Sequence, residues 1–231
     1  MHRSSRAGRS QRGNILFLIL LAVVLFAALS YAVTQGMRGG GKDGGEEKAK
    51  LFATQLIQIG AALESTVLRT MMIDGTRDYG LDFSGPNSNM SPNNACLSDN
   101  CRIVQNGKVA LITIPDWASS DTSGAAHTRR PYILAASVEN IGTSAPDLLI
   151  VQYHLKASVC DAINQIVGLA SSSDLTVETA MSTWYQGNLT AFPASASVIG
   201  DQEVSFRGRT TFCYRATGSS TYNFAHVILA R

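Results

Sequence analysis

The sequence predicts an α+β protein in which an N-terminal transmembrane helix and a second, long amphipathic helix precede a C-terminal antiparallel β-sheet head. Three observations predict this fold: an uninterrupted apolar run near the N-terminus, an apolar stripe at helical spacing after it, and short apolar runs of strand composition toward the C-terminus. We divide the 231 residues into a basic leader (1–13), a transmembrane helix (14–38), a glycine-rich joint (39–45) and an exported head (46–231).

The first element is the apolar run of residues 15–33, which contains no charged residue, no proline and no glycine. A helix of about 19 residues rises about 1.5 Å per residue and covers roughly 28 Å, close to the thickness of the hydrocarbon core of a bilayer. The leader before it carries four arginines and no acidic residue. Because basic residues beside a membrane segment stay in the cytoplasm, we expect a cytoplasmic N-terminus and an exported C-terminal part.

Three fates of this segment fit the pattern. A secretory signal peptide would be cut after Ala32, an uncleaved signal anchor would keep the whole run, and cleavage after Gly13 would leave the helix on the mature chain. The apolar run is longer than the roughly 7–15 residues of a signal-peptide core. Its length and the position of Gly13 favour the third fate.

A basic leader, a glycine and an apolar helix that follows without a gap resemble the N-termini of type IV pilins and type II secretion pseudopilins. In those families a prepilin peptidase cuts after the glycine, so the resemblance implies processing between Gly13 and Asn14. It also implies an inner-membrane protein whose partners are other pilin or pseudopilin subunits and which assembles through the apolar helix. The residues that would form this assembly helix include Ile15, Phe17, Leu18, Leu21 and Leu25.

One position departs from the family pattern. Family members usually carry a glutamate at the fifth mature position, where it is thought to pair with the N-terminal amine of a neighbour; here that position is Leu18. Some minor pseudopilins also lack this glutamate. The resemblance therefore implies a minor or atypical subunit in place of a major pilin.

The second element begins after a glycine-rich segment. Five glycines occupy residues 39–45, and each costs a helix about 1 kcal/mol relative to alanine, so we expect a flexible joint. Residues 46–72 then predict an amphipathic helix that ends at Asp74-Gly75. Its apolar stripe comprises Phe52, Leu56, Ile59, Leu63 and Val67, while Gln55, Gln58, Ser65 and Arg69 lie off the stripe.

The rest of the head has strand composition with one further helix. Residues 79–106 predict a long surface loop, and 157–169 predict a helix. We expect strands at 108–114, 132–138, 148–153, 203–206, 210–215 and 222–229, although 148–153 could also begin a helix.

The four cysteines of the exported part predict two disulfides, for which three connectivities are possible. We favour Cys96–Cys101, which closes a short polar loop, and Cys160–Cys213, which joins the predicted helix to the C-terminal strands. A zinc site is the rival interpretation. The CxxxxC spacing is wider than a zinc knuckle and no second ligand pair has metal spacing, so we expect no metal.

Other motifs that resemble functional sites have simpler explanations. Residues 36–43 nearly match a phosphate-binding loop, but Asp43 stands where the Ser or Thr that ligates magnesium is required, and a glycine linker explains the match. We expect no cofactor. The Asn188-Leu189-Thr190 sequon is expected to be inert. Lys and Arg are not clustered in the head, so no nucleic-acid partner is predicted.

Histidines and aromatic residues complete the list of candidates. His127, His154 and His226 are scattered along the sequence, without an HExxH pattern, and we do not predict an enzyme. The residues of a catalytic triad can be far apart in sequence, so the sequence alone does not test for one. Aromatic side chains could line a carbohydrate- or partner-binding surface, but packing is the commoner role. The residues concerned are Trp117, Trp184, Tyr185, Phe192 and Phe224.

These features together predict a pilin-like structural subunit of a bacterial type IV pilus or secretion pseudopilus. Its head would lie in the periplasm or in an extracellular filament. Two alternatives stay open: a single-pass, membrane-anchored periplasmic binding or structural domain without a filament role, and a secreted enzyme, which has less support.

Overall fold

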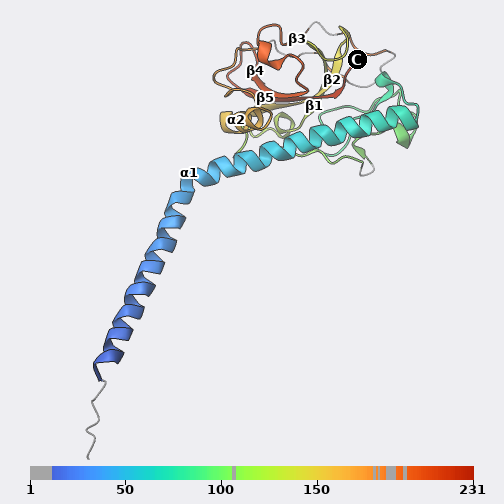
Figure 1. Ribbon diagram of the computed structural model, residues 1–231. Helices are drawn as coiled ribbons and strands as arrows, with labels where there is room; N and C mark the ends of the chain where they lie inside the picture. The colour runs from blue at the N-terminus through green and yellow to red at the C-terminus, as the bar shows by residue number, and fades with distance from the viewer. Residues whose placement is uncertain (1–11, 106–107, 179–180, 182, 186–190, 195–196) are drawn as a thin grey trace, which may run out of the picture. The chain divides into compact units, whose positions relative to one another are not determined.

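The computed structural model describes residues 12–105, 108–178, 181, 183–185, 191–194 and 197–231, with side chains left out at 12–16, 18, 29, 32–43 and 127 (Figure 1). The chain divides into two compact units, Met1–Gly45 and Glu46–Arg231. Most of the predicted leader and the sequon at 188–190 lie outside the described residues. The first unit is helical where it is described, and the second is an α+β head.

Helix α1 spans Arg12–Ile73. Its backbone is helical through residues 39–45, where a flexible glycine-rich joint stays a prediction. Glycine lowers helix propensity without a steric clash, and the residues on both sides are good helix formers. The predicted end is confirmed, because α1 stops at Ile73 and Gly75 follows with a φ of +65°, a conformation that favours glycine.

The predicted apolar stripe of residues 46–73 is confirmed. Phe52, Leu56, Leu63 and Val67 are buried, and Ile59 is half-buried against the same core. The four polar residues predicted off the stripe are all exposed. This part of α1 therefore packs on the head in the way that its 3.6-residue periodicity indicates.

The head contains one five-stranded sheet with the order β3-β1-β2-β5-β4 (Figure 1). The pairs β1–β2, β2–β5 and β5–β4 are antiparallel, and β3 pairs with β1 in parallel. The predicted α+β fold is confirmed, with one parallel pair at the edge of the sheet. The strands are β1 (Tyr132–Val138), β2 (Asp147–Leu155), β3 (Val198–Ile199), β4 (Thr211–Arg215) and β5 (Tyr222–Leu229); helix α2 spans Ala157–Ile166.

Two predicted strands are wrong. Residues 108–114 bury Val109, Leu111 and Ile114 but form no strand, and the Ile114 amide instead donates to the carbonyl of Arg129. Residues 203–206 contain the 3-10 helix η5 (Val204–Phe206), because the Glu203 carboxylate accepts a hydrogen bond from the Ser205 amide. Such a local side-chain bond competes with strand pairing.

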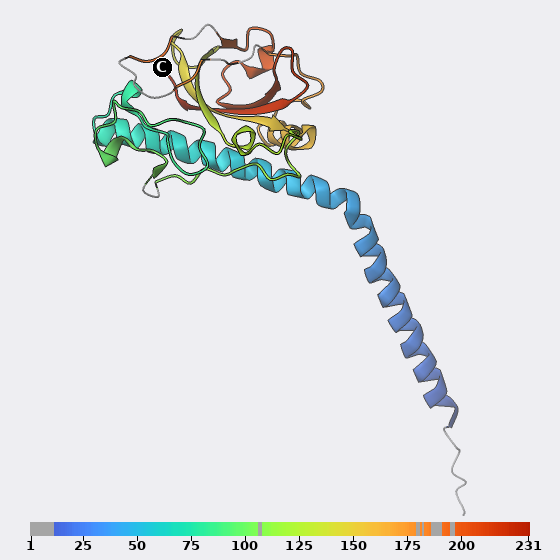
Figure 2. The same ribbon diagram turned by 180° about the vertical axis from the view of Figure 1, so that it is seen from behind.

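Both faces of the sheet are buried. One face carries the core that contains the head part of α1 and helix α2, with Ile150 and Phe224 from the strands. The opposite face carries a second core, to which Leu175 and Phe206 of the connecting segments contribute. Figure 2 shows the orange and red connections on the side of the sheet away from α1. The head thus buries its own sheet without a partner.

Candidate functional site

The predicted assembly helix is solvent-exposed where its side chains are described. Phe17, Leu21 and Leu25 are 64%, 48% and 57% exposed, and Phe26 is 75% exposed. Leu20 and Val23–Phe26 lie on different sides of the helix and are all exposed, so the described side chains of this part show no buried face. At Gly13, Asn14, Ile15 and Leu18 the structure describes helical backbone only. A helix that is apolar all round is typical of a membrane span or of the interior of a bundle.

Among the described residues, one helix, Gly44–Ile73, is long and apolar enough to cross a membrane, with a mean hydropathy of 1.3. However, one third of its most apolar stretch is buried, and the apolar stripe of this helix contributes to the core of the head. A core helix passes the same test of length and composition. The described part of the predicted transmembrane helix contains a shorter apolar helix, Ile19–Ala28.

The structure brings together a carboxylate, an imidazole and a hydroxyl that the sequence analysis did not link. His226 on β5 lies with its Nδ1 2.6 Å from the Thr211 hydroxyl on β4, and its Nε2 is 3.4 Å from a Glu64 carboxylate oxygen on α1. Hydrolytic triads use the same three groups. Here the backbone of α1 closes over the ring: a Cβ placed on Gly60 would lie 2.6 Å from His226 Cγ. The hydroxyl and imidazole are therefore packed as parts of the helix–sheet interface.

His154 does not join this cluster. His154 lies at the irregular end of β2, where its φ is +61°, and the side chain of His127 is outside the described part of the chain. Burial lowers the pKa of His226 below its ordinary value, and the nearby Glu64 carboxylate partly opposes that shift. Within the described residues, no group of three or more His, Cys, Asp or Glu side chains is placed to hold a metal ion.

A polar pocket of about 460 Å³ lies between the first turns of the head part of α1 and helix α2. Glu46 and Lys50 line it from α1, and Asp161 and Gln165 line it from α2. The Asp161 carboxylate already accepts three hydrogen bonds from Ser171 and Ser172. All three bonds end on Oδ1. Because the lining mixes both charge signs, it does not define a ligand class.

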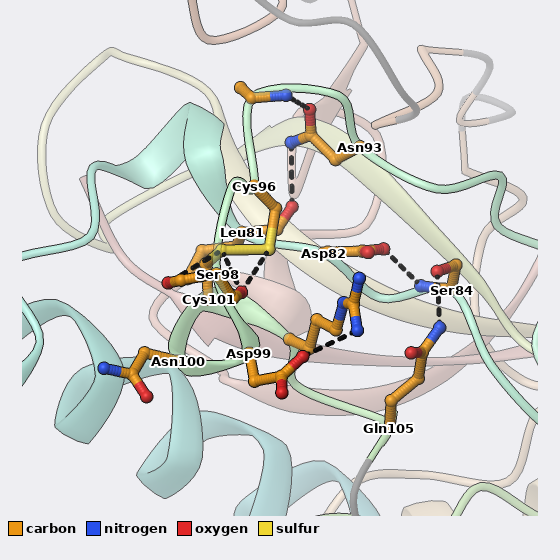
Figure 3. The surroundings of a disulfide bond; sticks show 12 residues. Leu81, Asp82, Ser84, Asn93, Cys96, Ser98, Asp99, Asn100, Cys101 and Gln105 are labelled. Atoms are coloured by element: carbon orange, nitrogen blue, oxygen red, sulfur yellow. Dashed lines mark hydrogen bonds and ion pairs between the residues drawn. A yellow bond between two sulfur atoms is a disulfide. The ribbon is translucent and has the colours of Figure 1, made fainter.

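Both predicted disulfides are present. Cys96–Cys101 closes a short loop, and the Asn93 side-chain amide just before it donates to the carbonyl of Leu81 (Figure 3). The same amide also donates to the carbonyl of Tyr79. Cys101 is buried, whereas most of the loop is exposed.

The second bridge, Cys160–Cys213, joins α2 to β4 and is fully buried. The Asn164 side chain accepts a hydrogen bond from the Cys213 amide and donates one to the Cys213 carbonyl. This bridge is therefore part of the core that holds α2 on the sheet.

The five aromatic residues singled out in the sequence have different environments. Tyr185 and Phe224 are buried, and Phe192 packs against the same core. The Tyr185 hydroxyl donates to the Asp78 carbonyl and accepts from the Leu81 amide, and burial raises its pKa. Trp117 and Trp184 remain about two-fifths exposed. The aromatic residues thus do not form one surface.

Sequence reasoning missed Gly60, Glu64 and Thr211. One signal was available, because Gly60 interrupts an otherwise regular helical pattern, and an isolated glycine in a helix often marks a close approach.

Comparisons with protein-family models, with curated proteins and with solved structures find no match to this chain.

Proposed function

We propose that this chain is a pilin-like structural subunit, minor or atypical, of a membrane-anchored type IV pilus or secretion pseudopilus. The observation that carries the proposal is the exposure of the described apolar side chains of residues 17–26, beside a head that buries its own core. The position of Gly13 directly before this helix adds the processing site that such a subunit needs.

The exposed helix requires an apolar environment. Burying one large apolar side chain contributes about 1.5–3 kcal/mol, so a run of such residues strongly favours lipid or like helices over water. In a membrane the helix would sit among acyl chains, and in a filament it would be covered by the helices of neighbouring subunits. Assembly would then transfer the helix between two apolar surroundings without exposing it to water.

The topology and the disulfides support the same proposal. The arginine-rich leader favours a cytoplasmic N-terminus and an inner-membrane protein whose head lies in the periplasm or in an extracellular filament. Two disulfides agree with an oxidising compartment. Leu18 in place of the usual glutamate favours a subunit that docks differently from a major pilin, such as one that initiates or caps a filament.

A single-pass anchor without a filament role is the second candidate. The same exposed helix supports it, because a plain anchor also needs an apolar helix beside a self-contained head. The two candidates differ at Gly13, which only the first requires.

The mature N-terminus tests the proposal. We would express the full chain in a bacterium that carries a prepilin peptidase and measure the intact mass of the membrane-extracted protein. A chain that begins at Asn14 is expected; one that begins at Val33 would indicate a signal peptide, and one that begins at Met1 a plain anchor.

A pair of leader variants makes this experiment specific. Gly13→Leu should abolish processing, whereas Gly8→Leu places the same side chain in the same leader and should leave processing intact. Cleavage that persists in Gly13→Leu, or that fails equally in both variants, would contradict recognition of Gly13.

A further inference from the structure

Helix α1 crosses strand β5 at Gly60 with very little space. A Cβ on Gly60 would come within 2.6–2.9 Å of three atoms of His226, distances at which the ring or the helix would have to move. Glycine costs a helix about 1 kcal/mol relative to alanine, and no turn at this position requires a glycine. The close approach of α1 to the imidazole explains why a residue without a side chain stands here.

The imidazole connects three elements of the head. Its Nδ1 meets the hydroxyl of Thr211, its register partner on β4, and its Nε2 faces the Glu64 carboxylate, one helical turn after Gly60. The register partner on β2 is the apolar Ile150. Glu64 is the charged group that faces the ring among the described side chains.

We propose that His226 is an acid-sensitive latch that holds the head part of α1 on the sheet in its neutral form. A neutral imidazole has one donor and one acceptor nitrogen. With the proton on Nε2, the ring accepts a hydrogen bond from the Thr211 hydroxyl through Nδ1, and its Nε2–H lies 3.4 Å from a Glu64 carboxylate oxygen. Protonation makes Nδ1 a second donor and places a positive charge on a side chain that is 5% exposed.

The direction of the pH effect follows from burial. Burial lowers the pKa of His226 in the folded head below the value of about 6.5 of an unfolded chain. The unfolded or locally opened state therefore binds the proton more readily. The stabilisation is fully present above about pH 6.5 and is lost as the pH falls through the folded pKa.

The effect of His226 has to be measured at α1 and not as the global stability of the head. Burial raises the pKa values of Asp147 and Glu178, so these carboxyl groups favour the folded head as the pH falls. Their contribution opposes that of His226 in any measurement of global stability. Hydrogen exchange of the amides of residues 56–68 reports the opening of α1 itself.

The experiment compares amide exchange of the full-length protein in detergent micelles at pH 7.5 and pH 5.0, corrected for the intrinsic rate. Opening of residues 56–68 should increase on the order of tenfold at the lower pH, because the open state binds the proton more readily. His226→Gln, which stays neutral, should remove this increase. His154→Asn removes the other described histidine and should retain it.

A second variant protects the test if His226→Gln fails to fold. Glu64 is 44% exposed at its side chain, so Glu64→Gln should fold, yet it removes the carboxylate that favours the imidazolium. The acid-induced opening should then become larger than in the wild type. A wild type whose exchange does not change with pH, a response that survives in His226→Gln, or a Glu64→Gln response equal to that of the wild type would overturn the proposal.

Discussion

Two parts of helix α1 carry leucines in opposite environments. The first part is apolar on every side, and the second alternates apolar and polar residues. Leu21 and Leu25 are 48% and 57% exposed in the first part, whereas Leu56 and Leu63 are 4% and 0% exposed in the second. The difference follows the spacing of the apolar residues. A stripe with a period of 3.6 residues indicates burial within the chain, while an apolar surface on every side indicates burial against lipid or another molecule.

Truncating a leucine in each part gives the largest expected contrast. Leu63→Ala should destabilise the head by about 2–5 kcal/mol, because it opens a cavity in the core beneath α1. Leu21→Ala should leave head stability unchanged. Urea unfolding in detergent micelles, followed by tryptophan fluorescence, measures both. Equal destabilisation by the two variants would show that the first part of α1 also packs within the chain.

Adding a charge to each part reverses the contrast. Leu25→Arg should impair membrane insertion by about 2.5–3.5 kcal/mol, the cost of arginine near the centre of a membrane helix. Leu51→Arg is the control, because Leu51 is 68% exposed on the head part of α1 and the same charge remains in water there. The measurement is the fraction of protein that stays in the membrane after alkaline extraction. Retention of both variants to the same extent would argue against a membrane span at residue 25.

A pair of glycine substitutions should give the smallest effects, with opposite signs. Gly45→Ala should stabilise α1 by up to about 1 kcal/mol, since a new Cβ there meets no atom within 4 Å. Gly60→Ala should destabilise the head by about 1–3 kcal/mol, because its Cβ would collide with His226. Circular dichroism measures the helix content and urea unfolding the stability. A stable Gly60→Ala head would mean that α1 and β5 can separate at little cost.

Elements with an unambiguous pattern were predictable from the sequence. Strands β1 and β5 match their predicted ranges, because each is an apolar run bounded by turn residues. Residues 108–114 have a similar alternation, but a strand also needs a partner, which a local pattern does not reveal. Strand β3 is two residues long and carries no period at all. The helix through residues 39–45 shows that an unfavourable propensity can be outweighed by the flanking helix.

The candidate sites divide in the same way. The apolar helix of residues 15–33 and the four cysteines could be named from composition and spacing along the chain. The contact of Glu64, His226 and Thr211 could not, because it depends on how α1 crosses the sheet and on the register of β4 with β5. The isolated Gly60 was the one sequence signal that indicated a close crossing of α1 over the sheet.

The two disulfides also impose an order in time on the maturation of the head. Their cysteines are separated by 5 and by 53 positions. In a chain that emerges from its N-terminal end, Cys101 follows Cys96 almost at once, whereas Cys160 waits until β4 has appeared. Early closure of the local bridge removes two thiols from the pool and reduces three possible pairings to one. Once the small bridge has closed, only the native pairing is left for the large one.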